Sequence, residues 1–196
     1  MRPIAVRLSP HRLLLALLVP AGLLWFFAGA FVGDLYYQRA MVLKEQIYFD
    51  SAATSLEHAI AWQPRQAAYY RELGRLYLAM SPWRRDGRRW IDQGIAAYRQ
   101  SLSVNPRDSR TSFDLGMAYV AAHDVGRAQA AFQSGLAVDP NNPSFYVARG
   151  AVYELQGRLD DAKAMFERAY LLSPYDREAL RKQLRFLDQI GAPPRK

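Results

Sequence analysis

Four arginines and two tryptophans are crowded into one short stretch of the 196-residue sequence, SPWRRDGRRWIDQG, which runs from Ser81 to Gly94. Arginine binds phosphate and carboxylate groups through charge-assisted hydrogen bonds, and tryptophan favours surfaces where apolar and polar groups meet. This chemistry fits a lipid headgroup, an anionic protein partner or nucleic acid, and it equally fits a solvated loop without a role. The six residues, here called the basic–aromatic segment, are Trp83, Arg84, Arg85, Arg88, Arg89 and Trp90.

The side chains that usually carry catalysis are few and scattered. Neither His11, His58 nor His123 has a ligand partner at metal spacing, and the absence of cysteine removes disulfides, thiolate metal sites and cysteine nucleophiles. The acidic pair Asp160 and Asp161 precedes an expected helix, where carboxylates stabilise the positive end of the helix dipole. We therefore expect a protein that is not an enzyme, with no catalytic residues, no cofactor, no metal and no small-molecule substrate.

Composition bounds the class of partner. The chain is 51% hydrophobic and 13% aromatic, so it can bury a core and fold as one domain. Its formal net charge is +8, but three of the positive charges, Arg2, Arg7 and Arg12, lie in a short N-terminal tail. The excess over the remaining residues is mild, so nucleic acid is the least favoured partner.

An internal repeat organises most of the sequence. Pro106, Pro140 and Pro174 lie 34 residues apart, and the stretch SFDLGMAYVAAHDVGRAQAAFQSGLAVDP aligns with YVARGAVYELQGRLDDAKAMFERAYLLSP. The matched pairs are Gly116 with Gly150, Tyr119 with Tyr153, Ala128 with Ala162, and Phe132 with Phe166. Glycine and alanine let two helices approach closely, phenylalanine fills the space around them, and proline ends each unit.

This pattern resembles the tetratricopeptide repeat family, whose signature is an aromatic residue, Leu-Gly and Tyr on one helix, then Ala, Phe and a closing Pro on the next. The resemblance implies an all-α fold, a right-handed α-solenoid of about three full units with partial units at its ends. Two departures are that no unit opens on Trp and that Arg149 replaces the Leu before Gly150.

The resemblance divides residues 34–196 into segments. Residues 34–66 form a degenerate helix pair, and 67–174 hold three units, at 67–108, 109–142 and 143–174. The first of these is eight residues too long, and the excess predicts an enlarged turn between its two helices at 81–90. Residues 175–190 form a capping helix with one apolar face, and 191–196 a disordered tail.

An uncharged apolar run, LLLALLVPAGLLWFFAGAFVG, occupies residues 13–33 and predicts a single transmembrane helix, because a 21-residue helix is about 31 Å long. The arginines before it place the tail 1–12 in the cytoplasm and the repeats in the periplasm of a bacterium, anchored in the inner membrane. The alternative is a cleaved secretory signal, because Ala28-Gly29-Ala30 has the form of a cleavage site.

The family resemblance also implies a partner-binding groove, because the first helices of such units line the concave face of the solenoid. The groove is expected to be basic at its start and apolar further along. Family members that capture the carboxy terminus of a chaperone use Lys and Asn here, and this chain lacks them. The expected lining residues are Arg71, Arg75, Leu78, Arg110, Phe113, Met117, Val120, Val147, Ala151, Glu154 and Leu155. Alternatively, some of the apolar ones pack against the capping helix.

These features predict a membrane-anchored, non-catalytic scaffold that binds a protein or peptide partner within a multiprotein envelope complex. A second hypothesis makes the chain a structural subunit of an integral-membrane complex. In that case the transmembrane helix is the main contact and the repeats form a peripheral lid.

Overall fold

The computed structural model describes the backbone of residues 10–173 and 177–191, and the side chains of these residues except 10–17, 19–27, 177, 179 and 188–191. The chain divides into two compact units, Met1–Tyr69 and Tyr70–Lys196. The tails expected at 1–12 and 191–196 lie mostly outside the described residues.

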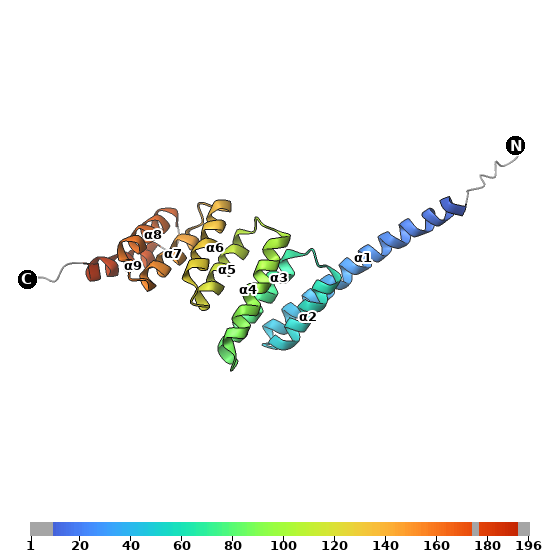
Figure 1. The fold of residues 1–196 in the computed structure, drawn as a ribbon, viewed down its shortest axis with the longest axis horizontal. Coiled ribbons are helices and arrows are strands. Elements are labelled where there is room, and N and C mark those ends of the chain that lie inside the picture. Colours follow the sequence, from blue (N-terminus) through green and yellow to red (C-terminus); the bar gives the residue numbers. More distant parts are fainter. Residues whose placement is uncertain (1–9, 174–176, 192–196) are drawn as a thin grey trace, which may run out of the picture. The chain divides into compact units, whose positions relative to one another are not determined.

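The first unit is an antiparallel helix pair, α1 (Pro10–Glu45) and α2 (Phe49–Trp62), which lie side by side in Figure 1. Small residues let the two backbones approach: Ala40 of α1 and Ala52 and Ala59 of α2 are fully buried, together with Leu56. The helix expected to begin at residue 34 is therefore the last part of α1, which runs without a break from Pro10.

The second unit stacks helices in chain order, as Figure 1 shows. Its helices are α3 (Ala67–Met80, whose first residues belong to the first unit), α4 (Gly87–Val104), α5 (Ser109–Ala121), α6 (Val125–Val138), α7 (Pro143–Leu155), α8 (Leu159–Leu172) and α9 (Arg177–Gly191). The pairs α5 with α6 and α7 with α8 are the two aligned repeats, and α9 packs on α8 as the expected cap.

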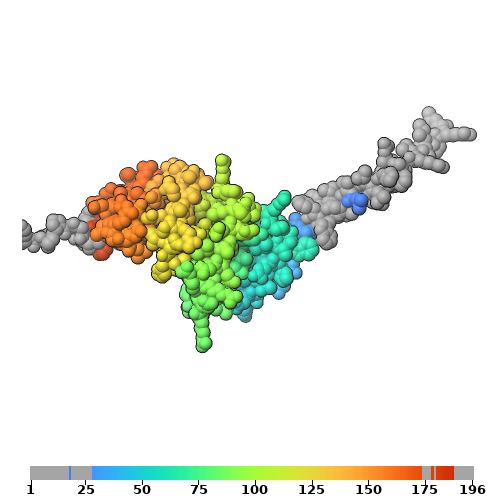
Figure 2. All heavy atoms as spheres, viewed as in Figure 1, coloured from blue at the N-terminus to red at the C-terminus, as the bar shows by residue number. Residues whose placement is uncertain are grey.

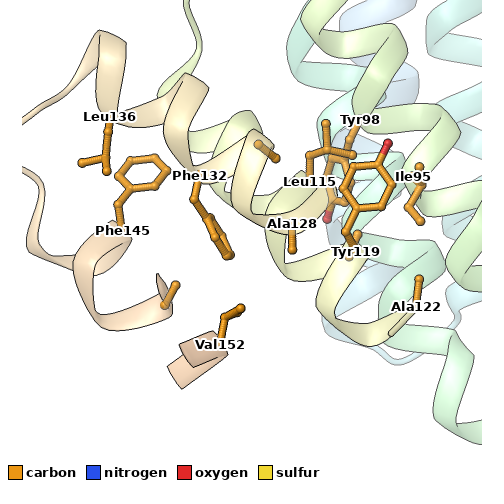
Figure 3. Packing of buried hydrophobic residues seen from close by; sticks show 13 residues of the cluster. Ile95, Tyr98, Leu115, Tyr119, Ala122, Ala128, Phe132, Leu136, Phe145 and Val152 are labelled. Carbon is orange, nitrogen blue, oxygen red and sulfur yellow. The ribbon is translucent and has the colours of Figure 1, made fainter. Parts of the chain in front are cut away.

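Side chains from α4 to α7 form one core that passes from repeat to repeat (Figure 3), and buried residues of α8 and α9 form another. Phe132 is fully buried, and its ring meets the ring of Phe145 from the next repeat edge to face, with centroids 6.4 Å apart. The small residues Ala128 and Ala162 are also fully buried. The phenylalanine and alanine residues at the repeated positions are therefore buried between helices, as their types predicted.

The expected turn at 81–90 is shorter in the structure than the sequence indicated. A short 3₁₀ helix, η1 (Ser81–Trp83), continues from α3, and α4 already begins at Gly87. The extra residues of this unit lengthen α4 at its start, so Arg88, Arg89 and Trp90 lie on a helix and not in a loop. The prediction was wrong because Asp86-Gly87, interpreted as the middle of a turn, is the boundary of the helix.

Short polar residues start the later helices. The Asp108 and Asp124 side chains accept hydrogen bonds from backbone N–H groups at the starts of α5 and α6, and Asn142 does so for α7. The turns inside the repeats use a left-handed residue, His123 in one and Gly157 in the next, at equivalent positions. These local signals mark the starts of α5, α6 and α7 and the turns inside the two aligned repeats.

Among the residues that the structure describes, no helix combines the length and apolar character needed to cross a membrane. The apolar run expected to span the membrane, 13–33, lies largely on residues whose side chains are outside the described part.

Candidate functional site: an apolar groove beside a polar hollow

An apolar groove of about 410 Å³ opens on α5 and α7. It brings together six residues that the sequence assigned to the partner-binding face. They are Phe113, Met117, Val120, Val147, Ala151 and Leu155. Helical spacing explains the convergence, because residues three or four apart lie on one face of a helix. Pro143, Ser144, Ala148, Val152, Ser173 and Leu180 complete the lining.

Three large apolar side chains of this groove remain open to solvent. Met117 is 42% exposed, Val147 37% and Leu155 74%. Exposed apolar side chains that share one concave surface are typical of a site that a partner covers. Leu180 of the cap also lines the groove, but it is buried, so the cap forms a wall and leaves the opening free.

Phe113 lines the groove as expected, but its ring also packs against the core. Its ring lies 5.8 Å from that of Phe132 and 5.4 Å from that of Phe145, measured between centroids. Such aromatic clusters stabilise the fold through buried area and edge-to-face contacts. Phe113 is therefore partly core, and the freely available lining consists of Met117, Val147 and Leu155.

A polar hollow of about 300 Å³ lies next to the apolar groove, and Phe113 and Ser144 line both. It contains the expected basic residues Arg71, Arg75 and Arg110, together with Asp114. Two of these three arginines are compensated by acidic partners. Arg71 pairs with Asp108 at 2.9 Å, and Arg75 pairs with Glu72 at 3.3 Å.

The pKa values of two acidic residues, Asp114 in the hollow and Asp108 paired with its Arg71, are shifted in opposite directions. Burial raises the pKa of Asp114, and the nearby charges of Arg75 and Arg71 only partly offset this effect. Burial would also raise the pKa of Asp108, but hydrogen bonds from Thr111 and the charge of Arg71 outweigh it and lower that pKa. Acidic partners therefore compensate Arg71 and Arg75, while Arg110 of the same hollow is exposed.

Two expected groove residues lie elsewhere or are already engaged. Leu78 packs against Gly94 of α4 so closely that a Cβ on the glycine would overlap the leucine side chain. It therefore belongs to the α3–α4 contact and does not line either cavity. Glu154 accepts a hydrogen bond of 2.7 Å from Gln183 of the cap, so this carboxylate secures α9.

The basic–aromatic segment projects from the second unit, where Figure 2 shows its green surface extending outward. Trp83 is 82% exposed, and Arg85 and Arg89 are also exposed. Arg84 lies over the ring of Trp90, 5.4 Å from its centroid, and that ring packs against Tyr77. All four arginines and Trp83 are therefore exposed, and only Trp90 is half-buried.

Arg88 has a structural contact that the sequence did not predict. Its guanidinium donates a hydrogen bond of 2.9 Å to the carbonyl of Ala122, the residue that ends α5, and it also pairs with Asp92. Carbonyls at a helix C-terminus lack intrahelical partners, and a cation there is favourable. One of the four arginines therefore links its own repeat to the next.

Chain comparisons agree with the repeat architecture. Two tetratricopeptide repeat models match the chain, one over residues 113–177 and one over 33–66. Together the two models cover about half of the chain. The second model matches the helix pair that we expected to be degenerate. The chain belongs to the tetratricopeptide repeat family, a fold that typically serves as a non-catalytic interaction module.

Solved structures with this fold are similar over most of the chain. A thermophilic tetratricopeptide repeat protein of Thermus thermophilus has a TM-score of 0.67 at 23% identity, covering 79% of this chain and 80% of that one. The MamA protein has a TM-score of 0.65 at 16% identity, covering 81% and 88%. The first such domain of Spaghetti, bound to an HSP90 peptide, has a TM-score of 0.55 at 22% identity, covering 64% and 92%.

Two curated proteins are similar in sequence but far longer. Cellulose synthase operon protein C of Pseudomonas fluorescens is 26% identical over 140 residues, which is 69% of this chain and 10% of that protein. Protein bimA of Emericella nidulans is 25% identical over 162 residues, 73% of this chain and 20% of that protein. The chain thus spans a fifth or less of the length of these relatives.

Proposed function

We propose that this protein is a non-catalytic scaffold that binds a segment of a partner protein in the apolar groove. The observation that carries the proposal is the convergence of Met117, Val147 and Leu155, exposed and apolar, on one concave surface of about 410 Å³. Burying such side chains stabilises a complex by roughly 25 cal/mol per Å² of apolar surface before the costs of association are subtracted.

The adjoining polar hollow limits what the segment can be. Because two of its three arginines, Arg71 and Arg75, are paired with acidic residues, a strongly charged segment gains little from them, and the exposed apolar side chains of the groove set the affinity. The two cavities share Phe113 and Ser144, so an extended segment can place apolar side chains in the groove and polar groups in the hollow. The peptide-bound Spaghetti domain is a precedent for peptide capture by this fold.

We further propose that residues 13–33 anchor the protein in the inner membrane of a bacterium, with the N-terminus in the cytoplasm and the repeats in the periplasm. The uncharged run and the preceding arginines support this orientation. The similarity to cellulose synthase operon protein C is consistent with an envelope complex, such as one for polysaccharide export, as the setting.

One observation favours the second hypothesis, a structural subunit whose membrane helix is the main contact. The apolar run and the α1–α2 helix pair share the single helix α1, so a protein bound to the membrane part would also hold this helix pair. Purification in mild detergent separates the two hypotheses. A partner that is retained by a variant with a disrupted groove supports the subunit, and a partner that is lost supports the scaffold.

Site-specific photocross-linking tests the scaffold in living cells. A photoreactive amino acid at Met117 or Val147 should cross-link one discrete segment of one partner. The same amino acid at Leu171, which is 70% exposed on α8 and outside the groove, should not. Equal cross-linking from both surfaces would contradict a groove-specific partner.

A further inference from the structure

A third cavity, of about 540 Å³, lies within the first unit where the turn after α2 meets α1. Its wall on α1 is made by Gly29 and Ala30, and its other wall by the turn itself. The turn residues that line it are Trp62, Gln63, Pro64, Arg65 and Gln66. Gly29 and Ala30 belong to the last turns of the apolar run, so this cavity marks the level at which the run ends.

The turn is held on the helix by direct contacts. The side-chain amide of Gln63 donates hydrogen bonds to the carbonyl of Ala30 and to the carboxylate of Asp34. A Cβ on Gly33 would lie 2.7 Å from that amide nitrogen, so a larger residue there would require the Gln63 side chain to shift. The hydroxyl of Tyr69 donates to the same carboxylate. The position of the cavity beside α1 is therefore fixed, and Asp34 is already engaged by neutral donors.

The residues that face outward around the cavity have the chemistry of a membrane interface. Trp62 is 42% exposed, and Arg65 and Gln66 are exposed. Among the described residues Arg65 has no ion-pair partner, and it is the only charged residue that lines the cavity. Phe31, the residue after Ala30 on α1, is 65% exposed and does not line the cavity. Tryptophan and arginine at the end of an apolar helix are typical of the headgroup region.

We propose that this cavity holds the headgroup of an anionic phospholipid, with its phosphate at Arg65. The α1–α2 helix pair then lies directly at the membrane surface. The inference rests on the proposed membrane anchor. A cavity of this volume is in the range that small ligands occupy. Continuity with the apolar run places the cavity at headgroup depth, and Arg65 supplies the charge complement to a phosphate.

The absence of cysteine allows the depth of single positions to be measured without background. Gln66→Cys places a nitroxide label at the rim of the cavity, and Gln46→Cys places the same label at the other end of the α1–α2 pair, about 24 Å away along the helix. Both glutamines are exposed, so neither label disturbs the core. The full-length chain is reconstituted into vesicles of phosphatidylethanolamine and phosphatidylglycerol, and flotation first establishes whether it is inserted.

We expect the label at position 66 to be shielded from a water-soluble nickel chelate and accessible to oxygen, at headgroup depth, and the label at 46 to be fully accessible to the chelate. Arg65→Gln should lower the association of spin-labelled phosphatidylglycerol by about fivefold, since one basic residue at a membrane surface contributes about 1 kcal/mol. Arg39→Gln, on the exposed surface of α1, is the control and should have a smaller effect.

The outcomes separate this inference from the anchor. A chain that does not float contradicts the anchor, and the lipid site with it. If the chain floats and the chelate reaches both labels equally, the membrane anchor is supported and the lipid site is contradicted. A label at 66 shielded from both reagents would show that protein covers the cavity, which also overturns it. Unchanged phosphatidylglycerol association in Arg65→Gln would overturn the role of that arginine and the anionic headgroup.

Discussion

The ring of Phe132 occupies the space beside Gly116 so closely that a Cβ on the glycine would overlap the ring. The next repeat has the same arrangement between Gly150 and Phe166, where that Cβ would lie 2.8 Å from the ring. Each repeat therefore closes by placing a phenyl ring of its second helix on a glycine of its first. This relationship explains why the two residue types recur at fixed positions.

Replacing Gly116 by alanine should destabilise the protein. The added methyl group must displace the fully buried Phe132 ring, and overpacking of this kind typically costs about 1–3 kcal/mol. The free energy of unfolding of the full-length chain in detergent, followed by circular dichroism, measures the effect. Gly126→Ala is the matched control, because a Cβ there meets nothing closer than 3.9 Å. It should be neutral or stabilising by up to about 1 kcal/mol. Equal effects would contradict the glycine contact.

Arg88 and its neighbour Arg89 should differ in their effect on stability. Arg88→Ala removes the hydrogen bond to the Ala122 carbonyl and should lower the free energy of unfolding by about 1 kcal/mol. Arg89→Ala removes an exposed side chain and should change it by less than about 0.5 kcal/mol. Thermal unfolding of the two variants side by side makes the comparison. A stability loss confined to Arg89→Ala would contradict the link between the repeats.

Asp108 should make stability depend on pH in the acidic range. Its folded-state pKa is lowered from the ordinary value of 3.8, so the unfolded chain binds the proton more readily. The stabilisation is complete above that value and is lost as the pH falls through the lower folded-state pKa. Asp108→Asn keeps a capping acceptor but loses the charge that pairs with Arg71, and should cost about 1 kcal/mol at pH 7. Denaturation at several pH values should show this difference shrinking below pH 3.8; a constant difference would contradict it.

Ile47 should be replaceable by glycine with a gain in stability. Its φ of 67° is left-handed, a conformation that costs a β-branched residue about 1–2 kcal/mol. The side chain is 73% exposed, so little packing is lost. After the greater freedom of glycine in the unfolded chain is subtracted, a gain of about 0.5–1 kcal/mol remains. A lower melting temperature for Ile47→Gly would show that the exposed isoleucine stabilises the turn.

The repeat positions could be predicted from the sequence because each residue type follows from a local packing requirement. The spacing of Pro106, Pro140 and Pro174 fixed the period, and Gly116 and Phe132 had types that only one packing arrangement explains. The start of α4 could not be predicted in this way. Whether Gly87 lies in a turn or begins a helix depends on the contacts of the residues that follow, including the hydrogen bond from Arg88 to the next repeat.

The candidate site was predictable in its location and less so in its chemistry. The family resemblance assigned Met117, Val147 and Ala151 to one concave face, and all three line the same groove in the structure. The charge of the neighbouring hollow depends on pairs from different helices, such as Arg71 with Asp108, which no spacing along the chain indicates. The aromatic contacts of Phe113 likewise arise between repeats.

Partner binding in the apolar groove can be tested by measuring the affinity of the cross-linked partner segment for the full-length protein. Isothermal titration with wild type, Val147→Asp and Leu171→Asp compares a charge inside the apolar groove with a charge on an exposed apolar residue outside it. We predict that Val147→Asp weakens binding at least about tenfold, or 1.4 kcal/mol, and that Leu171→Asp leaves it unchanged. Equal affinity of wild type and Val147→Asp, with both proteins folded, would contradict partner binding in the groove.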